Sequence, residues 1–243
     1  MTQMPKFRII LSNFGYNDST MFLLERIISV VAPHECIVCG QEGPLVCRYC
    51  EPDLCLPLPP HCYLCNALTA NNAVCTACRR VSPLRHVWIA SDYNGYPKQL
   101  IYKLKFEGAQ AAAGIVSRAM QDATPYLEDV ILVPIPTATS RIRQRGYDHA
   151  KLLADKLGES MRLLIEYLLR RVGQTRQVGT KRHERQVQLQ DAFWPVSVNR
   201  IRGTHILLVD DVITTGSTLE QAAKVLKLAG AKSVDAVVFA QKR

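Results

Sequence analysis

The residues with the clearest chemical potential lie between positions 206 and 218. The run Ile-Leu-Leu-Val is typical of a buried strand, and Asp210 and Asp211 follow it at the carboxyl end, where α/β sheets bind ligands. The start of the next helix offers backbone N–H groups to a phosphate, and Gly216 permits its close approach. The phosphate would be bound by Thr214, Thr215, Gly216, Ser217 and Thr218.

The paired acids indicate what the phosphate is attached to. Asp210 and Asp211 can accept hydrogen bonds from vicinal ribose hydroxyls or help to hold magnesium. An ordinary strand followed by an N-capped helix would leave both acids unexplained. The stretch therefore predicts a sugar-phosphate site.

A second group of chemically active residues is the set of nine cysteines between positions 36 and 78, eight of which form four Cys-x-x-Cys pairs. This spacing lets one tight turn present two thiolates to a tetrahedral metal, and two such turns complete a structural zinc site. The gaps between pairs favour two sequential sites, with an interleaved pairing left open, while Cys55 is outside every pair. The predicted ligands are Cys36, Cys39, Cys47 and Cys50 for one ion, and Cys62, Cys65, Cys75 and Cys78 for the other.

Two alternatives for the cysteines are disulfides and a redox pair. The apolar run at 21–32 is twelve residues long and contains Glu25 and Arg26, so it is too short to span a bilayer, and no signal-peptide cleavage site follows it. We therefore expect a cytoplasmic protein whose thiols stay reduced, with a short helix at 21–32 after a loose tail. No strand and helix pattern of the thioredoxin kind surrounds the cysteines, which disfavours redox chemistry.

The elements that position these residues follow from composition and periodicity. Hydrophobic residues make up 48% of the 243 positions, so the chain is globular, and a net charge of +9 favours an anionic partner. We expect a tail and helix at 1–35, a cysteine-rich module at 36–80 and an α/β domain at 81–243. Its mainly parallel sheet, with helices on both faces, would use strands at 87–93, 130–136, 167–171, 205–210 and 234–240, and helices at 97–106, 108–121, 147–157 and 217–229. Residues 174–191 would form a loop or hood.

Residues 208–218 resemble the signature of type I phosphoribosyltransferases, in which the acids face the ribose and the Thr-Thr-Gly-Ser-Thr loop holds its 5-phosphate. Together with the four cysteine pairs, the Tyr-Lys-Leu-Lys-Phe-Glu-Gly run at 102–108, Val-Pro-Ile-Pro at 133–136 and Arg-Gly-Tyr-Asp at 145–148, this stretch resembles the ComF family (ComFC and GntX type). The resemblance runs from about residue 20 to the end. It implies phosphoribosyl pyrophosphate with magnesium as ligand and a role in natural transformation, in which single-stranded DNA is imported.

The same resemblance places further residues at the ligand. Arg141 and Arg145 would clamp the pyrophosphate, a task that suits the planar guanidinium. Lys103 and Lys105 point to different faces of their helix, so at most one reaches the ligand, and Lys105 is the candidate. The basic residues of the hood would meet pyrophosphate or a nucleic-acid backbone, and they are Lys181, Arg182 and Arg185. A solvated surface charge is the alternative for each of these cations.

Three functions compete. The favoured one is a competence protein that binds phosphoribosyl pyrophosphate and single-stranded DNA, with or without catalysis, and that works with other DNA-uptake or DNA-processing proteins. The second is a metabolic phosphoribosyltransferase acting on an unknown base, and the third is an adaptor whose phosphate loop is vestigial. Four aromatic residues could stack on bases, although packing in the core is the more common fate of such residues: Tyr102, Phe106, Tyr147 and Trp194.

Overall fold

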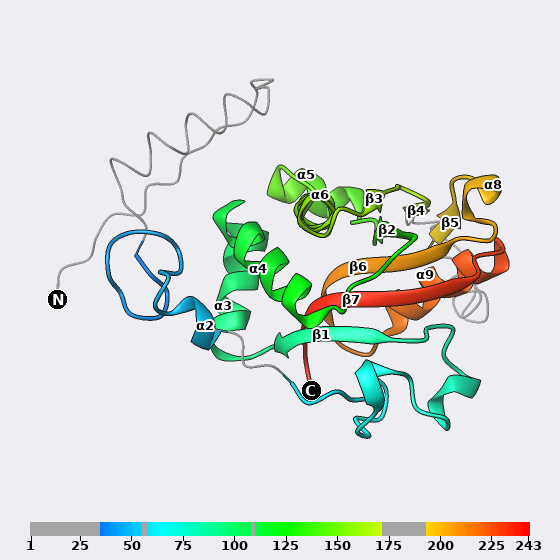
Figure 1. The fold of residues 1–243 in the computed structure, drawn as a ribbon. Helices are drawn as coiled ribbons and strands as arrows, with labels where there is room; N and C mark the ends of the chain where they lie inside the picture. Colours follow the sequence, from blue (N-terminus) through cyan, green and yellow to red (C-terminus); the bar gives the residue numbers. More distant parts are fainter. Residues whose placement is uncertain (1–34, 55–57, 108–109, 172–192) are drawn as a thin grey trace, which may run out of the picture.

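The computed structural model describes residues 35–54, 58–107, 110–171 and 193–243 (Figure 1). The predicted tail and first helix, Cys55, and the hood with Lys181, Arg182 and Arg185 lie outside these ranges. Within them, no helix has the length and apolar character needed to cross a membrane.

The centre of the fold is a five-stranded sheet in which every pairing is parallel, in the order β1-β7-β6-β2-β3 (Figure 1). This confirms the predicted α/β class. Its strands are β1 (Val87–Asp92), β7 (Ser233–Gln241), β6 (His205–Ile213), β2 (Val130–Pro134) and β3 (Leu164–Ile165).

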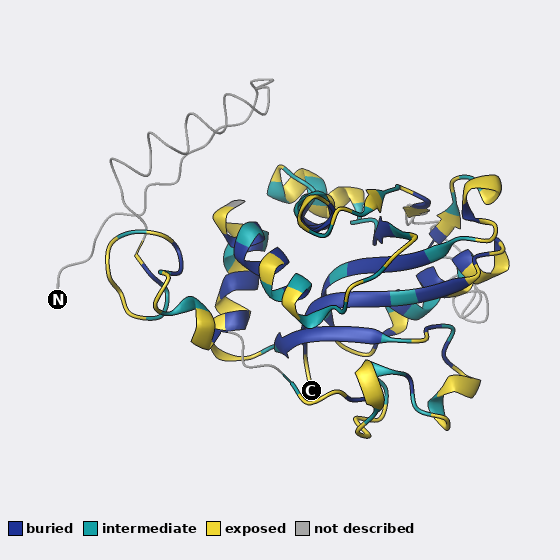
Figure 2. Cartoon of the chain, in the orientation of Figure 1, coloured by how far each residue is buried: buried dark blue, intermediate teal, exposed yellow. Residues whose placement is uncertain are grey.

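The two faces of the sheet support two hydrophobic cores, because successive side chains of a strand point to opposite faces. On β6, Leu207 and Val209 join one core, whereas Ile206 and Leu208 join the other. The strands are accordingly buried along most of their length (Figure 2). The core that contains Leu207 and Val209 is completed by three helices, α3 (Gly95–Phe106), α4 (Gln110–Ala123) and α6 (His149–Met161). The core that contains Ile206 and Leu208 is completed by α9 (Ser217–Leu228).

Several element boundaries differ from the prediction. β6 continues to Ile213 because Val212 and Ile213 still pair with β7, so the two acids lie within a strand and not after it. The strand predicted at 167–171 is wrong as a member of the parallel sheet. The sheet is joined by β3 instead, and β4 (Leu169–Arg171) pairs antiparallel with β5 (Phe193–Pro195) in a separate hairpin-like unit. Of the strand expected at 167–171, only residues 169–171 are extended in a strand, and β3 lies just before the predicted range.

In the described part of the α/β domain, two short helices were not expected from the sequence, α5 (Thr139–Arg145) and α8 (Val198–Ile201). Helix α5 follows the Val-Pro-Ile-Pro run and ends at Gly146, whose φ of +82° is in the left-handed region that glycine adopts without strain. The turn at Gly146 leads directly into α6. Two of the predicted ligand-binding arginines therefore lie on one short helix.

The cysteines form two groups that are far apart in the fold (Figure 1). The first cysteine cluster (Cys36, Cys39, Cys47 and Cys50), with α2 (Glu51–Leu54), packs through Leu45, Val46 and Leu54 on the core that includes α4. The second cysteine cluster (Cys62, Cys65, Cys75 and Cys78), with η1 (Ala70–Asn72) and η2 (Cys78–Arg80), packs on the core that includes α9. The cysteine-rich region thus covers both faces of the sheet.

Candidate functional site

The two acids of β6 have different surroundings. Oδ2 of Asp211 lies 2.5 Å from Nζ of Lys105 and 3.1 Å from Nε2 of His149, and the residue is only 5% exposed. Asp210 is less buried, and its Oδ1 accepts a hydrogen bond of 2.9 Å from the backbone N–H of Asp211. Asp211 is therefore engaged by bases of the protein, whereas Asp210 is the acid left for a ligand.

These surroundings separate the acidities of the two carboxyls. Burial, reinforced by the negative charge of Asp211, raises the pKa of Asp210 to about 7. Burial also opposes ionisation of Asp211, but the hydrogen bond from His149 and the charge of Lys105 outweigh it and lower the pKa of Asp211 to about 2. Near neutral pH the site thus holds one fixed carboxylate and one carboxyl that can gain or lose a proton.

His149 is placed by the start of α6. Asp148 caps this helix by accepting hydrogen bonds from the N–H groups of Ala150 and Lys151, and Thr137 donates to the same Asp148 oxygen over 2.8 Å. NH1 of Arg145 lies 2.9 Å from Nδ1 of His149. The same NH1 lies 3.4 Å from Nε2 of His149, so Arg145, His149 and Asp211 form one continuous chain of side-chain contacts.

The predicted phosphate loop presents its hydroxyls to solvent. Thr214, Thr215 and Ser217 are exposed, and Thr218 is half-buried in the first turn of α9. The Thr215 hydroxyl donates to Ser217 Oγ over 3.1 Å, and Gly216, with φ of +80°, precedes the helix. The loop follows directly on β6, so exposed hydroxyls, helix N–H groups and Asp210 all lie at the carboxyl ends of the strands.

The predicted cations divide into bound and free ones. Lys105 reaches Asp211, while Lys103 pairs with Glu107 at 2.8 Å, so Lys105 is the one of the two lysines that contacts the paired acids, and its role at a ligand stays a prediction. The Arg145 guanidinium lies 5.2 Å from the centre of the Phe106 ring, and its buried Nε has no hydrogen-bond partner within the described residues. Arg141 is exposed on α5. The turn after β2 borders a cavity of about 210 Å³, which is lined by Pro134, Ile135, Pro136, Asp148, Lys151, Tyr167 and Leu169.

Three aromatic side chains that were expected in the core are exposed. Tyr102 and Phe106 are 54% and 55% exposed, and their ring centres are 5.1 Å apart on successive turns of α3. Trp194 is 50% exposed. The expectation that these three rings pack in the core is therefore wrong, because the α3 and β5 positions that they occupy face solvent. Tyr147 is half-buried.

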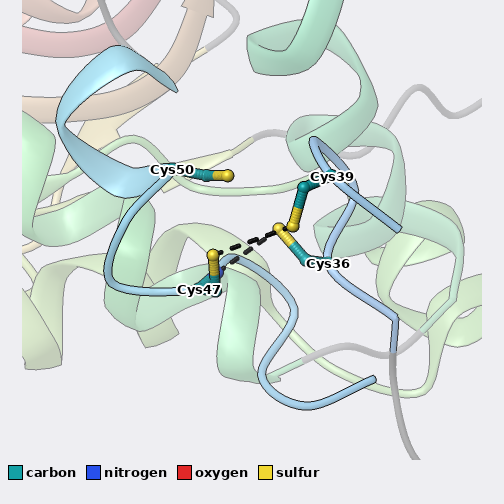
Figure 3. Close-up of side chains that lie close together, drawn as sticks. All are labelled: Cys36, Cys39, Cys47 and Cys50. Carbon is teal, nitrogen blue, oxygen red and sulfur yellow. Dashed lines mark hydrogen bonds between the residues drawn. The ribbon is translucent and has the colours of Figure 1, made fainter. Parts of the chain in front are cut away.

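The two cysteine clusters fit tetrahedral four-sulfur sites. In each cluster the four Sγ atoms lie within 4.8 Å of one another, an arrangement that agrees with the sequential pairing. Figure 3 shows the first cluster. The Sγ atoms of Cys39 and Cys47 are 3.9 Å apart and those of Cys65 and Cys75 are 3.6 Å apart, close to the ~3.8 Å that four sulfurs around zinc require. Hydrogen bonds from the backbone N–H groups of Cys39 and Cys47 lower the pKa of Cys36 to about 6, whereas the side-chain hydrogen bond with Cys47 raises the pKa of Cys50 to about 12.

The fold and these sites define a phosphoribosyltransferase-type α/β protein with two cysteine clusters suited to structural zinc. Consistent with this class, the family described as "Phosphoribosyl transferase domain" matches residues 141–243. A solved structure titled as the allosteric regulatory enzyme of purine biosynthesis is 17% identical, with a TM-score of 0.40, over 56% of this chain and 29% of that chain.

Proteins of similar sequence show to which family within this class the chain belongs. The competence protein ComFC of Bacillus subtilis is 30% identical over 194 residues, which cover 74% of this chain and 77% of the relative. The DNA utilization protein YhgH of Escherichia coli is 30% identical over 193 residues, covering 73% and 81%. The competence protein F of Haemophilus influenzae is 32% identical over 145 residues, covering 56% and 63%. The chain belongs to the ComF family of competence proteins.

Two residues that the structure places at the site were not predicted, His149 and Tyr63. His149 is one of six histidines, and only its position after the cap residue Asp148 distinguishes it in the sequence. Tyr63 lies in a Cys-x-x-Cys turn, where the sequence suggests metal binding and nothing else. His149 contacts Asp211 and Tyr63 contacts Gly216, so each residue reaches the site through a contact between distant parts of the chain.

Proposed function

We propose that this ComF-family protein binds phosphoribosyl pyrophosphate, with magnesium, at the carboxyl edge of the sheet, and single-stranded DNA on the surface beside it. The observation that supports this ligand is the position of Asp210, which comes just before the exposed hydroxyls of 214–218 and, among the described residues, forms no ion pair, whereas Lys105 and His149 contact Asp211. Its relatives are named competence and DNA utilization proteins, and these names support the proposal that the chain binds DNA.

Different residues of the site would bind different parts of the ligand. The loop from Thr214 to Thr218 binds the 5-phosphate, and Asp210 accepts hydrogen bonds from the ribose hydroxyls. Arg141 contacts the pyrophosphate, beside the turn that follows β2. Magnesium, when bound, neutralises part of the pyrophosphate charge, and Asp210 is the carboxylate available to it. Asp211, held by Lys105 and His149, fixes the position of the strand end and not of the ligand.

The surface next to this site suits a single strand. Stacking on exposed rings and charge pairing with the backbone are the two interactions by which proteins hold single-stranded nucleic acid. Tyr102 and Phe106 supply the rings, and α5 supplies Arg141, Arg143 and Arg145, the last of which lies against Phe106. Lys181, Arg182 and Arg185 remain candidates for further backbone or pyrophosphate contacts.

Calorimetric titration with magnesium and phosphoribosyl pyrophosphate tests the first half of the proposal. Wild type should bind, and Asp210→Asn should bind at least 10-fold more weakly, because an amide cannot replace a carboxylate toward two hydroxyls or a cation. Equal affinity of the two proteins would contradict the assignment of Asp210. Turnover of the ligand with any free nucleobase would favour the metabolic phosphoribosyltransferase instead.

Fluorescence anisotropy with a labelled oligodeoxythymidine tests the second half. Replacing Tyr102 and Phe106 together by alanine should weaken binding by roughly 5-fold or more for each base that stacks. Tyr126→Ala is the matched control. Tyr126 is 84% exposed, but it precedes β2 and so belongs to the side of the sheet where the strands begin, whereas the proposed site is where they end. Affinity should fall steeply between roughly 50 and 200 mM salt. An absence of binding at low salt would rule out the DNA-binding role.

A further inference from the structure

The second cysteine cluster reaches the phosphate loop through one side chain, Tyr63. This residue lies inside the Cys62-x-x-Cys65 turn and is only 5% exposed. Its ring covers Gly216 so closely that a Cβ atom at position 216 would lie 2.7 Å from the Tyr63 Cε2 atom. The phosphate loop therefore rests on a side chain of a metal-binding turn.

The hydroxyl of Tyr63 makes a second connection to the same region. It donates to Oε1 of Glu220 over 2.8 Å, and Glu220 belongs to the first turn of α9, whose N–H groups face the predicted phosphate. Ser82 Oγ lies 2.8 Å from the same hydroxyl. Ring and hydroxyl together thus contact the loop residue Gly216 and the helix that follows it.

The position of Tyr63 depends in turn on the cysteine cluster. Cys62 is fully buried in the core that includes α9, and its carbonyl accepts the hydrogen bond from Asn66 N–H that closes the turn. The Tyr63 carbonyl accepts a hydrogen bond of 3.1 Å from Gln241, the last residue of β7. Cys62 and Cys65, two ligands of the same metal site, thus flank Tyr63 and hold its backbone.

Within the described residues, the first cysteine cluster makes no such contact with the phosphate loop. It packs on the opposite face of the sheet, and Glu51 beside it forms an ion pair with Arg118 of α4 at 2.6 Å. It also contains a tyrosine between two ligands, Tyr49, which is 71% exposed. The chain thus contains one metal site that touches the phosphate loop and one that provides an internal comparison.

We infer that Tyr63 is a positioning residue for the phosphate loop, and that metal in the second cysteine cluster and a sugar phosphate on the loop strengthen each other's binding. The inference rests on the proposed function, because it concerns the same ligand site. Metal holds the Cys62–Cys65 turn in the shape that places Tyr63 under Gly216, and a ligand that fixes the loop fixes Tyr63 in return. Such coupling is reciprocal, so each ligand must change the affinity of the other by the same factor.

Release of zinc to a chromogenic chelator measures this coupling in the wild-type protein. With magnesium and phosphoribosyl pyrophosphate present, one of two zinc ions per chain should leave several-fold more slowly and the other should leave at an unchanged rate. Cys39→Ser, which removes the first site, should retain the protected ion. Equal slowing of both ions, or of neither, would overturn the inference, and this measurement requires no change at Tyr63.

Substitutions at Tyr63 test its own part. Tyr63→Leu should weaken binding of magnesium and phosphoribosyl pyrophosphate by about 10-fold, within the range typical of coupling between two sites, and abolish the ligand's protection of zinc. Tyr63→Phe keeps the ring under Gly216 and should restore most of both effects. Tyr49→Leu, the matched change in the first cluster, should alter neither. If Tyr63→Leu binds the ligand and protects zinc as well as wild type does, the positioning role of Tyr63 is overturned. If the wild-type protein itself does not bind the ligand, the proposed function and this inference are overturned together.

Discussion

The ammonium of Lys105 lies 2.5 Å from Oδ2 of Asp211, and the two side chains are only 19% and 6% exposed. Removal of a cationic partner from a buried carboxylate leaves a buried charge uncompensated, which strongly destabilises the folded protein. Lys105→Met should therefore lower the free energy of unfolding by about 3 kcal/mol, measured by denaturant titration. Lys103→Met is the control, because Lys103 forms a more exposed pair with Glu107 and should cost about 0.5 kcal/mol or less. Equal losses in the two variants would show that the Lys105 pair is not a buried interaction of this kind.

The raised pKa of Asp210 predicts a pH-dependent effect on stability. Its pKa is about 7 in the folded chain and about 4 in an unfolded one, so the folded state binds the proton more tightly. Stability from this group is present below its unfolded pKa and is lost as the pH rises toward 7. The melting temperature of Asp210→Asn should therefore increasingly exceed that of wild type between pH 5.5 and 7 and the difference should then level off. A difference that is constant over this range would contradict the shifted pKa.

The sequential assignment of the metal sites makes opposite predictions for two double variants. Elemental analysis should find two zinc ions per wild-type chain, since each cluster has four sulfurs within 4.8 Å of one another. Cys39→Ser with Cys47→Ser affects one cluster and should retain one zinc. Cys39→Ser with Cys65→Ser affects both clusters and should retain none. The reverse result would indicate interleaved ligands.

Two glycines in helices offer a test of the packing around the site. A Cβ at Gly158 of α6 would lie 2.5 Å from two side-chain atoms of Ile165 on β3, whereas a Cβ at Gly114 of α4 would meet only the end of Arg118 at 3.7 Å. Gly158→Ala should destabilise the protein by about 1–3 kcal/mol through overpacking. Gly114→Ala should stabilise it by about 0.4–1 kcal/mol, because alanine loses less backbone entropy in a helix. Thermal denaturation of both variants measures the contrast, and a loss of the same size in both would contradict it.

Much of the fold could be predicted from the sequence because its signals are local. Apolar runs of strand length predicted four of the five strands of the sheet, and the cysteine spacing predicted both clusters with their correct partners. The strand at 164–165 was missed because two residues are too few for a periodic signal. The short helix α5 has a single apolar residue, Ile142, among its seven, so it carries no hydrophobic period from which a helix could be predicted.

The candidate site was less predictable because contacts between distant residues determine which group is free. Nothing local distinguishes Asp210 from Asp211, and the difference arises only when α3 and α6 bring Lys105 and His149 to the second acid. The same holds for Tyr63 and Glu220, which are 157 positions apart and belong to regions with different predicted roles. A single sequence gives the types of residue at a site, whereas the tertiary structure decides which of them are already occupied.

The segment that carries the second cysteine cluster also affects how the sheet ends. In the order β1-β7-β6-β2-β3, β1 is at an edge, and an open edge strand can pair with another chain and start aggregation. Asn71 of η1 accepts a hydrogen bond of 3.2 Å from the indole N–H of Trp88 on β1, and Ala73 forms an isolated bridge with His86 just before that strand. Loss of metal from this cluster would therefore free an edge that can recruit other molecules, so the zinc-depleted protein should be prone to self-association.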